Sequence, residues 1–257
     1  MPVAIITGAA RGIGAATAIA LAEVGHDIVL IDRCGPDPRL GYALATEEEL
    51  NEIAKRTGGT PIIGNAADPA VLDRAKAAAE SLGSIEIAVA AAGVIAGEGP
   101  AWELSSDAWQ ALEETNITAV RRLAAATIPA MLDRPRPRFG RFIAIGSPVA
   151  HKATPRLAAY AASKAAVESY VRSLAADLAG TDITANIVLP GSTDTELLAH
   201  SATVYDLDSP ERFAEHHLVD RLISPDEVAA TITWLCGSGA NAITGAAIAV
   251  DGGFSAR

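Results

Sequence analysis

TGAARGIG, residues 7–14, is the stretch that decides the fold. It closes a short β-branched run at 3–7 and leads directly into a helical segment at 12–25. Its three glycines let the backbone turn tightly and approach a pyrophosphate, whose charge then meets the N-terminus of the helix. Their spacing differs from the usual dinucleotide fingerprint, so the interpretation depends on their position in the first strand–helix turn. The candidate cofactor contacts in this turn are Gly8, Arg11, Gly12, Ile13 and Gly14.

Beyond this turn, short apolar runs alternate with helical segments along the chain. After the first strand at 3–7, strands are predicted at 27–31, 60–64, 85–90, 139–146, 183–189 and 246–250. Helical segments are predicted near 12–25, 46–57, 68–82, 105–133, 156–179 and 225–236. Continuous apolar strands separated by helices indicate a parallel sheet covered on both faces. We find no repeat and no linker-like change of composition, so we expect residues 1–257 to form a single doubly wound α/β domain, a Rossmann fold with a seven-stranded parallel sheet.

Composition excludes several classes of partner. The formal net charge of -11 argues against nucleic acid and anionic membrane surfaces. No apolar run approaches the roughly 18 residues of a transmembrane helix, and the N-terminus lacks the basic region of a signal peptide. Two cysteines, Cys34 and Cys236, make no disulfide framework, so a reduced, cytoplasmic setting is expected. The five histidines, including the adjacent His216 and His217, show no ligand spacing, and no metal is expected.

The end of the second strand predicts the choice of cofactor. Asp32 lies there, 24 residues after Gly8. A carboxylate at this place can accept hydrogen bonds from the adenosine ribose and repel a 2′-phosphate. At about 4 Å and an effective dielectric near 20, the repulsion is on the order of 4 kcal/mol. Arg11 and Arg33 flank Asp32 and could offset part of it, but the carboxylate favours NAD over NADP.

AAYAASKAAV, residues 158–167, carries a tyrosine and a lysine four positions apart on an alanine-rich helix. Hydride transfer from an alcohol needs a group that takes the hydroxyl proton, and a free tyrosine with a pKa of about 10 is too weak a base at neutral pH. By the same Coulomb estimate, Lys164 could lower the pKa of Tyr160 by about three. The spacing alone arises by chance in many helices, so the other motifs must support it.

Those motifs together resemble a short-chain dehydrogenase/reductase over essentially the whole chain. They are TGAARGIG, Asn116 in TNITAV, Ser147 placed 13 residues before Tyr160, YAASK, Pro190-Gly191 and the final VDGG at 250–253. The resemblance implies hydride transfer between a small-molecule alcohol or ketone and NAD. It implies that Tyr160 is the general acid/base, that Lys164 holds the nicotinamide ribose and that Ser147 orients the substrate oxygen. It implies that Asn116 keeps a water in the proton path and that Thr195 contacts the carboxamide.

The remaining cofactor contacts that the resemblance implies are Asn65, Ala66, Ala90, Gly93, Pro190, Gly191 and Thr193, besides Asp32 and the glycine turn. Ala90 stands where the family usually has Asn, and Asn65 where it usually has an Asp that binds the adenine amino group. The amide oxygen of Asn65 can still accept a hydrogen bond. Pro148, directly after the serine, is unusual and would reshape the substrate side. These departures leave a non-catalytic NAD-binding protein as an alternative, although the complete set of four catalytic residues speaks against it.

A narrower resemblance is to the mycofactocin-coupled subgroup, through GPDPRLGYALATEEEL at 35–50, AAGVIAG at 91–97 and PGSTDTELL at 190–198. PGSTDTEL is also similar to 2,3-dihydro-2,3-dihydroxybenzoate dehydrogenases, which remain an alternative. The mycofactocin-coupled resemblance implies that NAD stays bound and that a peptide-derived redox carrier removes its electrons.

Two long connections are expected to cover the site. The segment after Asp32 is longer than a short connection needs and is rich in Pro and Gly, so we expect an ordered flap at about 33–45. Folded over the adenine, its Leu40, Tyr42 and Leu44 would slow release of NAD, whereas a solvent-exposed loop would leave exchange free. The family places a substrate lid at about 195–222, where mixed aliphatic and aromatic residues suggest an apolar or aromatic alcohol. Apolar surface around the helix at 156–179 predicts a homotetramer, as the family implies.

Overall fold

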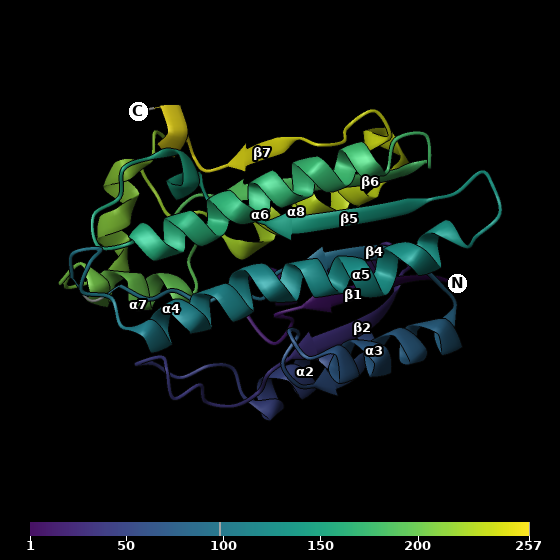
Figure 1. Cartoon of the computed structure of the whole chain (residues 1–257), viewed down its shortest axis with the longest axis horizontal. Coiled ribbons are helices and arrows are strands. Elements are labelled where there is room, and N and C mark those ends of the chain that lie inside the picture. Colours follow the sequence, from purple (N-terminus) through teal and green to yellow (C-terminus); the bar gives the residue numbers. More distant parts are fainter. Residues whose placement is uncertain (98, 257) are drawn as a thin grey trace.

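Seven parallel strands form one sheet in the order β3-β2-β1-β4-β5-β6-β7 (Figure 1), which confirms the predicted fold class. The computed structural model describes residues 1–97 and 99–256, so residues 98 and 257 of the expected domain lie outside the description. The strands are β1 (Pro2–Thr7), β2 (Asp27–Asp32), β3 (Thr60–Ile63), β4 (Ser84–Ala90), β5 (Gly140–Ile145), β6 (Ile183–Pro190) and β7 (Ala247–Val250).

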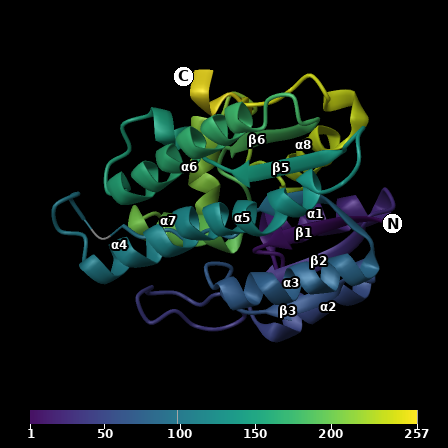
Figure 2. The ribbon, with the colours of Figure 1, turned by 45° about the vertical axis from the view of Figure 1, so that its right-hand side comes forward.

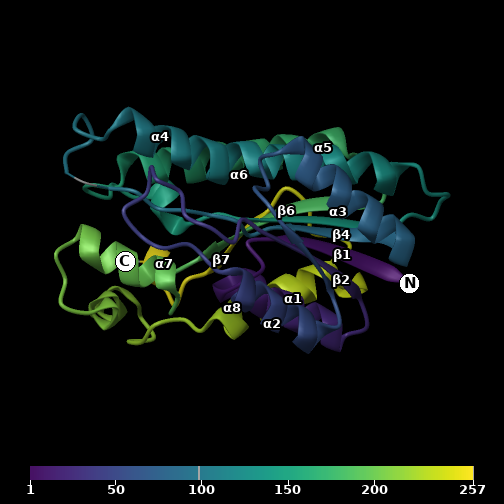
Figure 3. The ribbon, with the colours of Figure 1, turned by 90° about the horizontal axis from the view of Figure 1, so that it is seen from below.

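Alternate residues of each central strand enter two separate apolar cores, which is why these strands are apolar throughout. In β1, Val3 and Ile5 pack on one face of the sheet, and Ala4 and Ile6 pack on the other. The first core lies under α3 (Pro69–Leu82), α5 (Ala119–Leu132) and α6 (Ala158–Asp177), and the second under α1 (Gly12–Glu23), α2 (Glu47–Thr57) and α8 (Pro225–Cys236). Figure 3 shows these two helical layers with the sheet between them.

The strand order reverses between β1 and β4, and this reversal positions the site. In a doubly wound sheet, the connections that leave neighbouring strands at such a point diverge and open a crevice at the carboxyl ends. The glycine turn follows β1, Asp32 ends β2, and Ser147 follows β5. All three therefore lie at one edge of the sheet, the edge that α7 (Glu196–Val204) covers in Figure 1.

The helix expected at 105–133 is divided in three. It consists of α4 (Ser106–Leu112), a π-helical stretch at Glu113–Thr118 and α5. The wide π-helical stretch carries Glu114 and Asn116, whose side chains bond to segments distant in the sequence. Such stretches are rare and frequently occur at functional sites, and helical periodicity does not predict them.

The two long connections have different structures. Residues 33–45 form no helix or strand, and in Figure 2 this segment extends beyond the sheet on the side of α4 and α7. The lid contains α7 and a 3-10 helix at Pro210–His216, neither of which was predicted as helical. None of the helices in the described part of the chain is both long and apolar enough to cross a membrane.

Candidate active site

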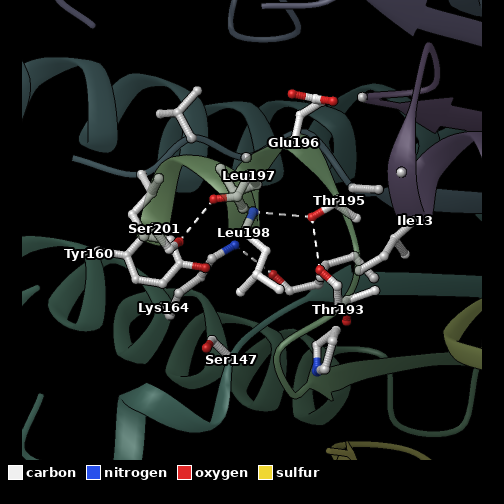
Figure 4. Close-up of a pocket in the computed structure, with 18 of the residues that line it drawn as sticks. Ile13, Ser147, Tyr160, Lys164, Thr193, Thr195, Glu196, Leu197, Leu198 and Ser201 are labelled. Carbon is white, nitrogen blue, oxygen red and sulfur yellow. Dashed lines mark hydrogen bonds between the residues drawn. The ribbon is translucent and has the colours of Figure 1, made fainter. Parts of the chain in front are cut away.

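One cavity of about 700 Å³ connects the glycine turn to the tyrosine–lysine pair. Asp32 and Asn65 line one end of it, and Ser147, Tyr160 and Lys164 line the other. Its volume lies in the range of small-molecule and cofactor sites. In Figure 4, Tyr160, Lys164 and Ser147 lie together on one side of this pocket, and Ile13, Thr193 and Thr195 lie on the other.

The glycine turn can be built only from glycine at two of its positions. Gly8 has a φ of 65°, and a Cβ there would lie 2.7 Å from the backbone nitrogen of Ala92. A Cβ at Gly14 would lie 2.0 Å from the carbonyl oxygen of Gly8. The turn is therefore packed tightly against the segment after β4, and α1 begins at the cavity with no side-chain cap from Arg11. Such a helix start binds phosphate groups well, so the residues present fit a dinucleotide.

Asp32 is held in place by the backbone that surrounds it. Its Oδ2 accepts a hydrogen bond from the Ala10 N–H at 3.0 Å, and its Oδ1 accepts one from the Cys34 N–H at 3.4 Å. Burial raises the pKa of Asp32, and these hydrogen bonds oppose the rise. Of the two arginines beside it, Arg11 also opposes the rise in the pKa of Asp32, but less than the hydrogen bonds do, and both arginines hydrogen-bond to other groups. Arg11 donates to the Ala43 carbonyl at 3.0 Å, and Arg33 pairs with Asp37 at 2.7 Å.

Asn65 forms a hydrogen bond with Glu114, a residue that the sequence analysis did not single out. Its amide nitrogen donates to Glu114, and its amide oxygen accepts from the Ala67 N–H at 2.9 Å. Glu114 also pairs with Arg39 at 2.7 Å and with Arg33 at 3.4 Å. The adenosine end of the cavity is thus bordered by an ion-pair cluster that includes two arginines of the flap. An isolated glutamate in a helical segment carries no sequence signal for this role.

Tyr160, Lys164 and Ser147 lie close together at one end of the cavity, as the resemblance implies. Tyr160 and Lys164 lie one turn apart on α6 and are 8% and 5% exposed, and Ser147 follows β5. The Lys164 ammonium donates to the Ile145 carbonyl at 3.0 Å and lies 5.6 Å from the centre of the Tyr160 ring. Ser147 hydrogen-bonds the Tyr160 side chain. Three groups from two elements therefore converge at one end of the cavity.

The lowered tyrosine pKa expected from Lys164 is absent, and this corrects the Coulomb estimate above. Burial raises the pKa of Tyr160 to about 12, and the hydrogen bond with Ser147 only opposes the rise. Burial also lowers the pKa of Lys164 to about 8. The estimate assumed a screened site, whereas here desolvation of the phenolate is the larger effect, and the ammonium contacts a carbonyl oxygen instead of the phenol.

Asn116 lies beneath the cavity wall and does not line the cavity. Its Oδ1 accepts from the Val94 N–H at 2.9 Å, and its Nδ2 donates to the Val94 carbonyl and to Ser163, both at 3.0 Å. These bonds brace the segment that carries Gly93, where a Cβ would lie 3.5 Å from the Lys164 nitrogen. Asn116 therefore holds this segment against α6, and its expected hold on a water stays a prediction.

Most of the other expected cofactor contacts line the cavity, and one does not. Those that do are Gly8, Arg11, Gly12, Ile13, Gly14, Asp32, Asn65, Ala66, Gly93, Pro190, Gly191, Thr193 and Thr195. Ala90 does not, because β4 continues through it and its side chain packs in the core under α3, α5 and α6. Ala91 and Ala92 line the cavity in its place. The expected contact of Ala90 with the cofactor stays a prediction.

Tyr42 of the flap was expected over the adenine, but its side chain contacts α7 and the segment after β4. Its hydroxyl accepts from the Ile95 N–H at 3.0 Å, and its ring stacks on His200 of α7 with 3.9 Å between centres. It packs against the same apolar cluster as Tyr160, instead of only over the adenosine end, while Leu44 lines the cavity and Leu40 is buried. The flap and the lid are therefore in direct contact.

The segment expected to be the lid also lines the cavity. Thr195 is the N-cap of α7, where its hydroxyl accepts from the Leu198 N–H at 3.3 Å and donates to the Thr193 carbonyl at 3.1 Å. Aliphatic and aromatic side chains dominate the lining, together with Pro148 and Val149. The lining residues of the lid and of the chain end are Thr195, Glu196, Leu197, Leu198, Ser201, Tyr205, Leu207, Phe213, His216 and Phe254.

The histidines and cysteines form no second reactive centre in the described residues. No group of three or more histidine, cysteine, aspartate or glutamate side chains within residues 1–97 and 99–256 could hold a metal ion. His151 pairs with Glu168 at 2.7 Å, outside the cavity lining. Cys34 and Cys236 are both free thiols, and burial raises the pKa of each to about 12, so neither is poised as a nucleophile.

Comparisons with known proteins agree with this geometry. A family model described as enoyl-(acyl carrier protein) reductase matches residues 8–255. A protein of Mycobacterium tuberculosis named as an uncharacterized NAD-dependent oxidoreductase is 34% identical, over 98% of this chain and 94% of its own. The (-)-trans-carveol dehydrogenase of Rhodococcus erythropolis is 31% identical, over 99% of this chain and 98% of its own.

The crystal structure of carveol dehydrogenase from Mycobacterium avium in complex with NAD has a TM-score of 0.91 to this structure. It is 28% identical and covers 100% of this chain and 98% of its own. The likeness therefore extends over the whole sheet and both connections. With its glycine turn, its Ser147, Tyr160 and Lys164 and these relatives, the chain belongs to the short-chain dehydrogenase/reductase family.

Proposed function

We propose that this protein is an NAD-dependent oxidoreductase that transfers a hydride between a small-molecule alcohol or ketone and the nicotinamide. The observation that carries the proposal is the convergence of Ser147, Tyr160 and Lys164 at one end of the cavity whose other end is bordered by Asp32. When bound, oxidised NAD accepts the hydride and adds positive charge near the phenol. That charge opposes the desolvation that keeps the phenol protonated in the protein alone.

The residues of this chain then handle the proton and the substrate oxygen. In ketone reduction the Tyr160 phenol donates its Oη proton to the substrate oxygen as the hydride arrives, and in alcohol oxidation the phenolate takes the hydroxyl proton as the hydride leaves. Ser147 holds the substrate oxygen beside the Tyr160 Oη. Lys164 lies one turn along on α6, where its position is fixed by the Ile145 carbonyl, and binds the nicotinamide ribose. Asn116 keeps the segment with Gly93 in place.

The choice of NAD over NADP follows from the charges around Asp32. The carboxylate borders the cavity, and both flanking arginines are engaged, Arg11 with the flap backbone and Arg33 with Asp37. A 2′-phosphate would therefore meet a carboxylate whose charge Arg11 offsets only in part. The relatives named above, an NAD-dependent oxidoreductase and an NAD-bound carveol dehydrogenase, support the same choice.

Retention of NAD is supported by the way the flap is fastened. At the adenosine end, Arg39 of the flap pairs with Glu114, and at the other end Tyr42 bonds Ile95 and stacks on His200. The flap is thus attached to the π-helical stretch, to the segment after β4 and to the lid. We therefore extend the proposal to a slowly exchanging NAD that a peptide-derived carrier, mycofactocin, reoxidises in place.

The proposed substrate is an apolar cyclic or aromatic alcohol. Apolar and aromatic side chains of the lid, with Pro148 and Phe254, line the substrate end of the cavity. A relative named for (-)-trans-carveol supports this chemical class. A 2,3-dihydro-2,3-dihydroxybenzoate-like substrate is the alternative, because Lys152 and His216 also line the cavity and offer its carboxylate polar partners.

The proposed assembly is a homotetramer, in a reducing cytoplasm. On α6 most of the exposed side chains are small, among them Ala162, Ala165, Ala166, Ser169 and Ser173, and the larger Arg172 and Asp177 lie in its second half, so the helix of another copy can approach closely at the first half. Small contact residues allow helix axes to come near one another.

The direct test of the proposed reaction is Tyr160→Phe. The variant keeps the ring and its packing but loses the hydroxyl, so turnover should fall by at least about 100-fold, the usual worth of a general acid/base. Bound nucleotide, measured after denaturation, should stay near the wild-type amount. A screen of cyclic alcohols with an artificial electron acceptor supplies the activity measurement. Retention of most of the activity in the Phe variant would refute the assigned role of Tyr160.

A further inference from the structure

A buried histidine beside the cavity has no part in the mechanism above. His217 is 1% exposed and follows the 3-10 helix of the lid. Its Nε2 faces the Ser192 N–H at 3.1 Å, and its Nδ1 faces the Arg221 carbonyl oxygen at 2.6 Å. Because the amide can only donate and the carbonyl can only accept, these partners assign the ring as neutral, with its proton on Nδ1.

The Ser192 N–H belongs to the loop that follows β6. Gly191, Ser192 and Thr193 of this loop, and Pro190 at the end of β6, all line the cavity. Since β6 is the neighbour of β5 on the side away from β2, the loop lies at the end of the cavity that holds Ser147 and not at the end that holds Asp32. It is therefore placed for the nicotinamide half of NAD and not for the adenosine half.

His217 is packed against this loop as well as bonded to it. A Cβ at Gly191 would lie 2.9 Å from the histidine Nε2 and 2.8 Å from the Cα of Asp251. On the other side of the loop, the Ile223 N–H donates to the Ser192 carbonyl at 3.0 Å. The loop is thus held between the end of the lid and the turn after β7, with the imidazole as the side chain that joins them.

We infer that His217 is a positioning residue, which holds the loop at 191–193 against the nicotinamide end of the cofactor through the Ser192 amide. The inference rests on the proposed function, because it requires NAD with its nicotinamide beside this loop. Loss of the ring acceptor leaves the Ser192 N–H without this partner. The loop then shifts, and the nicotinamide half of the cofactor is held less well while the adenosine half is unaffected.

Two variants separate the two ring nitrogens. His217→Gln can place its amide oxygen near the position of Nε2 and keep an acceptor for Ser192. His217→Asn can keep a donor near Nδ1 for Arg221, but its side chain is too short to reach Ser192. His151→Asn makes the same chemical change at an exposed histidine outside the cavity lining and is the matched control. Melting temperature reports any general loss of structure in each variant.

The measurement compares two ligands on nucleotide-free protein: NAD, and ADP-ribose, which lacks the nicotinamide. For His217→Asn we expect NAD to bind about tenfold more weakly and ADP-ribose to change by less than about twofold. For His217→Gln and the control, the ratio of the two dissociation constants should stay near that of the wild type. If His217→Asn does not fold, the test rests on the ratio of the two dissociation constants in His217→Gln.

Equal weakening of both ligands in His217→Asn, or an unchanged affinity for NAD, would overturn the inference. A higher ratio of the NAD to the ADP-ribose dissociation constant in His217→Gln would overturn the inference too. It would mean that a hydrogen-bond acceptor for the Ser192 N–H is not enough to hold the loop. Wild-type protein that binds neither ligand would overturn the proposed function itself, and this inference with it.

Discussion

Glu114→Gln should release NAD faster while leaving the catalytic residues untouched. Glu114 accepts from Arg39 at 2.7 Å and from Arg33 at 3.4 Å, and both arginines belong to the flap. The same two arginines pair with Asp37 at 2.6 Å and 2.7 Å, and the hydrogen bond from Arg39 lowers the pKa of Asp37 to about 2. Glutamine keeps an acceptor for Asn65 but removes the charge that fastens the flap to the π-helical stretch.

The expected magnitude follows from exposure. The side chains of Glu114, Arg33 and Arg39 are 32%, 24% and 21% exposed, so each ion pair is screened by solvent and contributes about 0.5–1 kcal/mol. Two pairs together contribute about 1–2 kcal/mol, which corresponds to NAD release about 5–30-fold faster. Because Asp37 has a lowered pKa, its own pairs persist above about pH 4 and are lost only as pH falls through about 2. Assays near neutral pH therefore isolate the effect of Glu114.

The assay loads protein with radiolabelled NAD, adds an excess of unlabelled NAD and follows the label retained on the protein over time. Glu113→Gln removes the same charge from the exposed neighbouring residue and serves as the control. High salt should reduce the difference between wild type and Glu114→Gln, because it screens the pairs that the variant lacks. Equal release rates in wild type and in Glu114→Gln would refute a flap fastened by this cluster, as would equal acceleration in both variants.

Cofactor choice and assembly give two further tests. In titrations of nucleotide-free protein, the wild type should bind NAD about 10–100-fold more tightly than NADP, and Asp32→Ala should reduce this difference in affinity. Equal affinities in the wild type would mean that the carboxylate does not select the cofactor. Light scattering at micromolar concentration should give four times the chain mass of 26.3 kDa, and a monomeric mass would contradict the proposed tetramer.

Much of the site could be predicted because its signals are local in the sequence. The four-residue spacing of Tyr160 and Lys164 is enough to place them on one helix face. The glycines between β1 and α1 are enough to predict a nucleotide-binding turn. The burial of the strands between two layers of helices could be predicted as well, because strands that are apolar throughout are buried on both faces. The outline of the cavity was therefore accessible from residues 7–14, Asp32 and the segment 158–167.

Contacts between distant segments were not accessible in this way. Glu114 meets Asn65 across 49 residues, and His217 meets Ser192 across 25. Neither pairing leaves a pattern in either segment, because partner choice depends on the order of strands and on the paths of loops. The same limit explains Ala90, where the exact end of β4 decides whether a side chain faces the core or the cavity.

The sequence by itself determined the parallel sheet, the nucleotide turn and the tyrosine–lysine pair, because backbone periodicity and glycine conformation are properties of a few neighbouring residues. Only the tertiary structure decided how the flap is held, through Glu114, Ile95 and His200, and how the loop after β6 is held, through His217. It also decided the state of Tyr160, whose pKa is raised to about 12 by burial. Desolvation and long-range pairing depend on what surrounds a group in space, which neighbours in the chain do not specify.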